Sequence, residues 1–424
     1  MKELEGKRLL ILGGSLWKKT IKQFAEDNNI VLVATGNDQS AGIFEIATEK
    51  YNVNSIDAVE MKKLIKEKNI DGVYMGGSET VISAACGYLN EMNMPCYCTK
   101  EQWNALQNKI NFKKLCIQNN LPVVPQYEIN ENVISIDENE YPLIVKPADG
   151  CGSNGFSICK NESELKVGIC KAKKNSPTES VIVEKYVENM GNVVFYTVSN
   201  GIIYFSGLSD KYSVQYKKQG SYVGGLFIYE SKYTNEFRMK FEKKIQKMIN
   251  SIGIKEGSFW IEVFHNKEQY YFNEVGYRYG GSASIYPTNY MYGINQVAMD
   301  MYYALTGRSK INGYKSMFAA DILRKKYYAV YPIHIKPGEI AKIEGVENIK
   351  CIKNIIEILI VKNIGDKVLD TGSFNQAGAL IHIVFDKKEE LIEIINEIHN
   401  KFKFLDTANN NLVNRMLDVS TIKL

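Results

Sequence analysis

The amino-acid sequence predicts a multidomain fold that combines α/β and α+β units, and three observations carry this prediction. The first hundred or so residues alternate short apolar runs with helical stretches, which is typical of a parallel sheet covered by helices. Residues 193–290 are rich in Tyr, Val, Ile and Phe and contain turn signals, which favours an antiparallel sheet. The tail, from near residue 315, joins a strand pattern to a helical one and is predicted to be a compact α+β unit.

The N-terminal α/β unit is assigned to residues 1–105. Apolar runs at Arg8–Leu12 and Ile30–Ala34 predict two strands with a helix between them. A further strand is predicted at Gly72–Met75, and a helix follows it at Glu79–Asn90. This order of strands and helices indicates a parallel sheet.

The central unit is assigned to residues 106–305. It begins with a strand at Leu143–Lys146, a glycine-rich turn, a strand at Phe156–Cys159 and a helix that starts near Asn161. Because a strand follows the glycine-rich turn, this turn is predicted to join two strands and not to open the helix of a dinucleotide site.

The C-terminal α+β unit is assigned to residues 306–424. It contains a predicted strand at Ala379–Phe385, followed by Asp386 and Glu389 at the spacing of a capping box. A helix is predicted next, because apolar residues recur at helical spacing: Leu391, Ile394, Ile395 and Ile398.

The composition excludes several classes of function. The 52 basic and 48 acidic residues leave a net charge of +4, which is too balanced to predict nucleic acid or an anionic membrane as a partner. No window approaches the roughly 18 consecutive apolar residues of a membrane span. The apolar run Leu9 to Leu12 is too short for a secretory signal, so a cytoplasmic protein is expected. The eight cysteines form no Cys-x-x-Cys pair, so we expect reduced thiols and no zinc site.

The segment Gly150–Gly155 has the glycine content of a loop that folds over phosphates through its backbone N–H groups, although a plain hairpin turn is an equally good interpretation. Lys146 lies four residues before this loop, at the end of an apolar strand, and could reach a phosphate that the loop holds. The alternative is an ordinary surface lysine. A second apolar strand runs into Val183–Val187 and could present backbone C=O and N–H groups to the edge of an adenine ring.

Glu262 and Glu274 lie on two predicted strands that flank a turn. If residues 266–268 form that turn, position 262 lies opposite 272, and the two carboxylates are diagonal neighbours on one face, roughly 7–8 Å apart at Cα. Carboxylates at this spacing can converge on one hard cation. A two-residue turn would place them on opposite faces instead. Arg278 follows Glu274 by four residues and suits a phosphoryl oxygen that the metal also touches.

Taken in their order along about residues 1–305, the lysine, the glycine-rich loop, the strand at Val183–Val187, the paired glutamates and the arginine resemble the pattern of the ATP-grasp superfamily of carboxylate–amine ligases. The resemblance implies a mobile lid over about residues 124–185, and the tail is similar to the C-terminal domain of the biotin-carboxylase-like and amino-acid-ligase branches. Glu262 and Glu274 are implied as magnesium ligands, and Arg278 as a contact to phosphate. Lys211 lies where similar enzymes line the active site and could meet a carboxylate or phosphate, although a solvated charge is as good an interpretation. The implied nucleotide contacts are Lys109, Lys146, Gly152, Ser153, Asn154, Gly155, Glu184, Lys185, Tyr186 and Val187.

The resemblance implies an ATP-dependent ligase that converts a substrate carboxylate to an acyl phosphate and joins it to an amine, with release of ADP and phosphate. The implied cofactors are ATP and Mg²⁺, with Mn²⁺ as a substitute; the implied partners are a small-molecule acid and amine, and similar enzymes are commonly homodimers. Two alternatives stay open: biotin-carboxylase-like carboxylation, and a nucleotide-binding module without catalysis.

The sequence departs from the family pattern at two positions. Gly276 stands where the family usually has a metal-binding Asn, and Asn192 follows Gly191 where a Glu is common nearby. Either the second metal relies more on Glu274 and on phosphate oxygens, which is the interpretation we favour, or activity is reduced. One more segment could contact a substrate: a predicted strand of the first unit ends at Gly76–Glu79, on the side where a substrate could bind. The simpler interpretation is that Ser78 caps the following helix.

Overall fold

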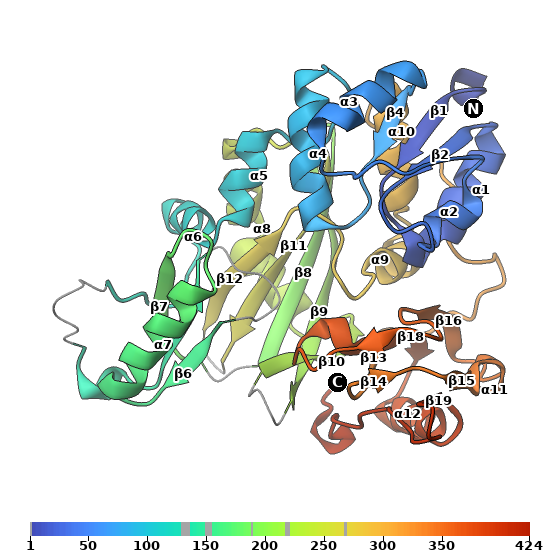
Figure 1. Ribbon diagram of the computed structural model, residues 1–424. Helices are drawn as coiled ribbons and strands as arrows, with labels where there is room; N and C mark the ends of the chain where they lie inside the picture. The colour runs from blue at the N-terminus through green and yellow to red at the C-terminus, as the bar shows by residue number, and fades with distance from the viewer. Residues whose placement is uncertain (1, 129–135, 149–154, 188–189, 217–220, 267–268) are drawn as a thin grey trace.

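The computed structural model describes the whole chain except residues 1, 129–135, 149–154, 188–189, 217–220 and 267–268 (Figure 1). An N-terminal parallel-sheet unit lies at the top of the view, and a long antiparallel sheet runs down from it. A small sheet with one helix stands to one side of this long sheet, and the C-terminal unit packs at its lower end. The predicted fold class is therefore confirmed.

The N-terminal unit is built on a four-stranded parallel sheet in the order β3-β2-β1-β4. Helix α10, which comes from much later in the chain, also packs on this sheet. It approaches closely because Gly72 has no side chain: a Cβ there would lie 2.4 Å from the carbonyl oxygen of Ala304. The elements are β1 (Arg8–Ile11), α1 (Lys18–Asn28), β2 (Val31–Thr35), α2 (Ile43–Ile46), β3 (Glu49–Tyr51), α3 (Ala58–Glu67), β4 (Gly72–Tyr74), α4 (Glu79–Glu91) and α10 (Gln296–Thr306).

Two helices, α5 (Lys100–Gln107) and α6 (Lys109–Gln118), lead from this unit to a small antiparallel sheet in the order β6-β5-β7. A short apolar core holds helix α7 against this sheet. That helix begins next to Asn161, as predicted, and the Asn161 side chain caps it by accepting from the Glu164 amide. The elements are β5 (Leu143–Pro147), β6 (Ser157–Cys159), α7 (Glu162–Lys174) and β7 (Val181–Lys185).

The large antiparallel sheet has eight strands in the order β12-β11-β8-β9-β10-β13-β18-β16. Its strands are β8 (Met190–Ser199), β9 (Ile202–Tyr216), β10 (Ser221–Tyr229), β11 (Gly257–His265), β12 (Tyr270–Gly276), β13 (Tyr327–His334), β16 (Ile355–Ile360) and β18 (Ala377–Phe385). Strand β10 pairs with β13, so the sheet runs without a break across residue 306. The division into three domains therefore stays a prediction at that boundary.

Helices and short strands complete the architecture around this sheet. Aromatic and aliphatic side chains of α8 bury against β11 and β12, which form the end of the sheet nearest the small sheet. The remaining elements are α8 (Thr234–Ser251), α9 (Ile285–Tyr292), β14 (Gly338–Glu339), β15 (Lys342–Glu344), α11 (Val346–Lys350), β17 (Lys367–Val368), α12 (Lys388–Lys401) and β19 (Lys403–Leu405).

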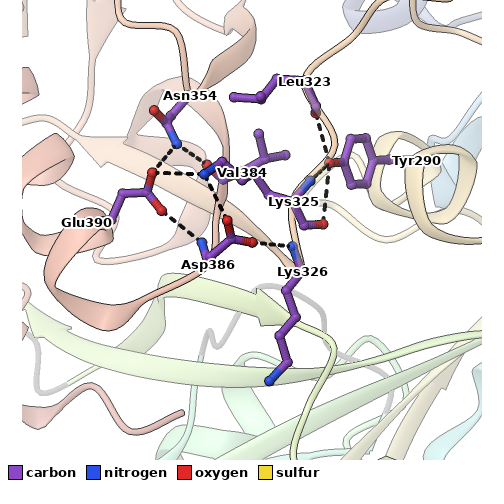
Figure 2. Close-up of polar contacts among 8 residues, drawn as sticks. All are labelled: Tyr290, Leu323, Lys325, Lys326, Asn354, Val384, Asp386 and Glu390. Carbon is purple, nitrogen blue, oxygen red and sulfur yellow. Dashed lines mark hydrogen bonds and ion pairs between the residues drawn. The ribbon is translucent and has the colours of Figure 1, made fainter.

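Residues 323–326 lead into β13, and hydrogen bonds hold them between α9 and the residue that follows β18 (Figure 2). On one side, the Tyr290 hydroxyl of α9 donates to the carbonyl of Leu323 at 2.9 Å and accepts from the amide of Lys325 at 2.6 Å. On the other, the Asp386 carboxylate accepts from the amide of Lys326 at 2.9 Å and from the Lys325 ammonium at 2.8 Å.

The capping box predicted at Asp386 is wrong. Helix α12 begins one residue later than that pattern requires, with Lys387 at the N-cap position and no side-chain cap. Glu390, and not Glu389, reaches back to accept from the amide of Asp386 at 2.8 Å. The reason is tertiary, because the Asp386 carboxylate is already engaged by the backbone of the incoming segment.

Candidate active site

A cavity of about 610 Å³ lies between the small sheet and the large sheet. The small sheet contributes β5, β6 and the end of β7, and the large sheet contributes residues of β8, β9, β10, β11 and β12. Most of the residues predicted to bind a nucleotide or metal line this one cavity: Lys109, Lys146, Glu184, Lys185, Tyr186, Val187, Lys211, Glu262 and Glu274.

Glu262 and Glu274 lie directly opposite each other on β11 and β12. The predicted diagonal register is wrong, because His265 pairs with Tyr270, one residue further along than predicted, and a β-bulge at Asn273 shifts the register once more. Directly paired residues of an antiparallel ladder project to the same face. The expectation that the two carboxylates share one face therefore holds, although the geometry that produces it is different.

The two carboxylates differ in their partners. Glu262 accepts from the Lys211 ammonium at 2.5 Å and from the Asn273 amide at 2.7 Å. Burial opposes its ionisation, but these two partners hold the pKa of Glu262 below its usual value. Among the described residues, no hydrogen bond or ion pair reaches the Glu274 carboxylate, and burial together with the charge of Glu262 raises its pKa.

Glu184 holds two lysines. Its carboxylate forms ion pairs with Lys113 and, at 2.7 Å, with Lys146. The side chains of Glu184 and Lys113 are fully buried, whereas Lys146 is slightly exposed. Lys146 also donates to Asn273 at 3.0 Å, so it links the small sheet to the large one. Burial and the nearby charge of Lys109 lower the pKa of Lys146 to about 8. Sequence reasoning missed Lys113, although it lies four residues after Lys109 on the same face of α6.

The predicted adenine segment is partly occupied by backbone contacts. The amide of Lys185 donates to the carbonyl of Pro125, and the amide of Tyr186 donates to the carbonyl of Pro142, both at 3.0 Å. Residues 185–187 still line the cavity. Of the predicted glycine loop, only Gly155 is described, with a left-handed φ of 79° that favours glycine; Gly152, Ser153 and Asn154 lie outside the described residues.

Arg278 does not line the cavity. Its guanidinium donates to Glu79, the first residue of α4, at 2.6 and 3.0 Å, and it lies over the Trp260 ring with 5.4 Å to the centroid. Ser78 occupies the N-cap position of α4 but makes no side-chain cap, so only the position of that cap is confirmed. The predicted phosphate-binding arginine thus joins the large sheet to the N-terminal unit.

Comparison with known proteins identifies the central part of the chain. Residues 108–301 match the family described as the carbamoyl-phosphate synthase L chain, ATP binding domain. This central part of the chain belongs to the ATP-grasp superfamily of enzymes. It is 28% identical, over 190 residues, to a formate-dependent phosphoribosylglycinamide formyltransferase of Sulfurisphaera tokodaii. The match covers 43% of this chain and 47% of that protein, so the chain spans about half the length of this relative.

Two solved structures share the ATP-grasp fold over almost the full chain. An L-amino acid ligase from Bacillus licheniformis superposes with a TM-score of 0.74 at 18% identity, covering 95% of this chain and 99% of that one. The biotin carboxylase domain dimer of the Hydrogenobacter thermophilus 2-oxoglutarate carboxylase, in complex with MgADP and bicarbonate, gives 0.73 at 17% identity, covering 94% and 90%. At these identities the likeness concerns the fold alone.

The ATP-grasp position usually held by Asn is closed to a side chain in this chain. Gly276 pairs with Trp260 across the ladder, and a Cβ at Gly276 would lie 2.4 Å from the indole ring. The other departure, Asn192, is buried and donates to Asp210 at 2.7 Å. Both departures therefore have a packing reason.

The C-terminal tail also borders the ATP-grasp cavity, which sequence reasoning missed. Met416, Leu417, Asp418 and Thr421 line the cavity, and the Tyr212 hydroxyl of β9 donates to the Lys423 carbonyl at 2.7 Å. The tail carries no motif that could have signalled this placement.

In the part of the chain that the structure describes, no helix is both long and apolar enough to traverse a lipid bilayer.

Proposed function

We propose that this ATP-grasp enzyme is an ADP-forming ligase that activates a substrate carboxylate as an acyl phosphate and joins it to an amine. One observation carries the proposal. Two carboxylates, the buried Glu262 and the partly buried Glu274, share one face of a β-ladder and border the same cavity as Lys109, Lys146 and Lys211. Paired carboxylates among several cations are the arrangement that a metal–triphosphate complex requires.

The cavity's lysines have separate tasks in this proposal. Lys109 and Lys146 would neutralise phosphate oxygens of ATP, and Glu184 would keep Lys146 directed across the cavity. Charge on the transferring phosphoryl group would be stabilised by groups already in place, which is the main contribution a protein makes to phosphoryl transfer. We assign residues 185–187 to the base, with Gly152–Gly155 as the phosphate loop.

The residues present fit a divalent cation. Glu274 has no partner among the described residues although burial opposes its charge, and an opposite charge would relieve both conditions. We propose that Glu274 and Glu262 hold Mg²⁺, or Mn²⁺ in its place. When bound, the cation would act as a Lewis acid on the phosphoryl oxygens. The binding of MgADP by the biotin carboxylase neighbour supports this assignment.

Lys211 and Arg278 are proposed to handle the acyl phosphate. Lys211 pairs with a carboxylate of the protein, Glu262. With a cation on Glu262, the Lys211 ammonium would be released to a phosphoryl oxygen. Arg278 would hold the acid substrate from the side of the N-terminal unit, where it now pairs with Glu79. We expect no covalent intermediate on the protein. The domain limits at 105 and 305, a lid over residues 124–185 and a homodimer remain parts of this proposal, and the dimeric biotin carboxylase neighbour supports the last.

The test is a screen for ADP and phosphate release over pairs of small carboxylates, including amino acids, with amines, followed by mass spectrometry of the product. Formate, and bicarbonate with biotin, form separate arms because relatives are named for formate-dependent formyl transfer and for biotin carboxylation. We expect one acid–amine pair to give ADP, phosphate and amide in equal amounts, and hydroxylamine to trap the acyl phosphate as a hydroxamate. ADP release that requires bicarbonate and biotin would overturn the proposal, as would calorimetric ATP binding without turnover in any mixture.

A further inference from the structure

Three cysteines that are separate in the sequence meet inside the N-terminal unit. Cys86 lies on α4, and Cys96 and Cys98 lie on the segment that follows this helix. Their sulfur atoms all lie within 4.8 Å of one another. Cys86 and Cys98 are fully buried, whereas Cys96 is partly exposed and gives the cluster a route to solvent.

The surroundings of this cluster are soft and apolar. The Cys96 and Cys98 sulfurs are 4.0 Å apart, and the Met75 thioether lies 4.0 Å from the Cys96 sulfur. Among the described residues, no carboxylate or imidazole joins the three thiols as a ligand group. Thiolate and thioether donors without oxygen or nitrogen ligands select soft cations such as Cu⁺ or Zn²⁺ over Mg²⁺.

The spacing matches one shared ion. At a metal–sulfur length of ~2.3 Å, three thiolates around one ion lie about 4 Å apart. The Cys96–Cys98 pair already has this separation, and the Cys86–Cys98 pair, at 2.8 Å, needs to open by roughly 1 Å. A rotation about one side-chain bond supplies such a movement without a change in the backbone.

The thiol-bearing segment is anchored beside the large sheet. Tyr97, between the two cysteines, packs edge-on against Tyr277 at 5.2 Å, and the Tyr277 hydroxyl donates to the Tyr97 carbonyl at 2.8 Å. Cys86 lies about two helical turns after Glu79, the partner of Arg278, on the same helix. An ion on the cluster would therefore join α4 to a segment that contacts the end of β12.

We propose that Cys86, Cys96 and Cys98 form a binding site for one thiophilic d¹⁰ cation, of the Cu⁺ or Zn²⁺ class, separate from the Mg²⁺ site proposed above. Binding replaces the three S–H protons, which leave to solvent, by three sulfur–metal bonds, with Met75 as an additional soft neighbour. No electron transfer is involved.

The test uses the full chain, reduced and metal-free, with Cys151, Cys170 and Cys351 replaced by Ser. Cd²⁺ is the probe, because its thiolate complexes absorb in the ultraviolet and its carboxylate complexes do not. Excess Mg²⁺ occupies the carboxylates of the ATP-grasp cavity. We expect the thiolate band to saturate at one equivalent of Cd²⁺ and the melting temperature to rise with Cd²⁺ concentration. Competition by Cu⁺ and by Zn²⁺ then identifies which ion the site prefers.

Single substitutions assign the band to the cluster. Cys96→Ser changes a partly exposed residue and should weaken Cd²⁺ binding at least tenfold in a folded protein. Cys98→Ala should do the same. Cys116→Ala is the matched control, because Cys116 is equally buried but lies in α6 outside the cluster. The Cd²⁺–thiolate band of this variant should be unchanged. The proposal is overturned if no band forms, if Cys96→Ser leaves the band intact, or if thiol counting finds Cys86 and Cys98 joined in a disulfide. None of these readouts depends on ligase turnover.

Discussion

Glu274→Gln should separate the requirements of catalysis from those of folding. The substitution keeps the shape of the side chain and removes one charge from a position where burial and Glu262 already oppose that charge. Because the pKa of Glu274 is higher in the folded than in the unfolded chain, the ionised carboxylate lowers stability at pH values above the folded-state pKa. The cost is about 1.4 kcal/mol for each pH unit that separates the folded and unfolded pKa values. We therefore expect the metal-free variant to be at least as stable as the parent near pH 8, and the difference to vanish below about pH 4, where the carboxyl is protonated in both states.

Turnover should change in the opposite direction. A unit charge about 4 Å from another, at an effective dielectric of about 20, contributes about 4 kcal/mol. Such a loss corresponds to roughly a thousandfold in rate, and since the remaining ligands compensate in part, we expect a decrease of at least about a hundredfold in Mg²⁺-dependent ADP release. Urea unfolding without metal and steady-state ADP production together measure the two effects.

Two comparison variants sharpen this result. Glu262→Gln removes the partner of Lys211 and leaves that ammonium unpaired, so it should lower both stability and turnover. Glu236→Gln removes a half-exposed carboxylate on α8 that pairs with Lys240, and it should change neither by much. Near-normal ADP production by Glu274→Gln, or a loss of more than about 2 kcal/mol in its metal-free stability, would refute the reasoning.

Four further predictions concern other residues of the chain. Arg278→Ala should lower ADP production at least about a hundredfold while ATP binding by calorimetry is kept, and unchanged turnover would remove this residue from the mechanism. MgATP affinity should weaken as pH rises through about 8, where Lys146 loses its proton; an affinity that stays flat from about pH 7 to 9.5 would contradict the assigned pKa. Burial raises the pKa of Asp300 to about 7, so the folded chain keeps a proton that the unfolded chain releases near 3.8, and stability should fall as pH rises between these values, by at most about 4 kcal/mol. Asp300→Asn should flatten that slope in pH-dependent urea unfolding. Gly276→Ala should cost about 1–3 kcal/mol in the same assay, because its Cβ meets Trp260, and a neutral effect would show that the indole moves aside.

The sequence predicted those parts of the fold that local pattern determines. The N-terminal strands at Arg8–Ile11 and Val31–Thr35 have buried apolar runs that a parallel sheet requires, and their limits match the prediction within one residue. The prediction that Glu262 and Glu274 share one face of the sheet is correct, but it was derived from a wrong register. A bulge at Asn273 depends on contacts across the sheet, and sequence spacing does not encode it.

The features that the sequence did not predict depend on contacts between residues far apart in the chain. Lys113 was missed because a lysine inside an amphipathic helix usually points to solvent, and only the burial of Glu184 shows that this one does not. No zinc site was expected because no Cys-x-x-Cys pair exists, yet the chain turns back after α4 so that Cys98 meets Cys86. In both cases the decisive neighbour lies far enough away along the chain that no local motif records it.

The pair formed by Arg278 and Glu79 reconciles a predicted phosphate contact with its position outside the cavity. The Arg278 side chain is 17% exposed and Glu79 is 37% exposed, so water reaches the pair and it contributes at most about 1 kcal/mol. Both guanidinium contacts go to one carboxylate oxygen, so the pair lacks the parallel two-oxygen geometry that makes arginine–carboxylate pairs strong. A substrate carboxylate or acyl phosphate that offers two oxygens would therefore compete well for Arg278. Under the proposed function, this exchange would bring the start of α4 into the reaction and would place recognition of the acid at the junction between the N-terminal unit and the large sheet.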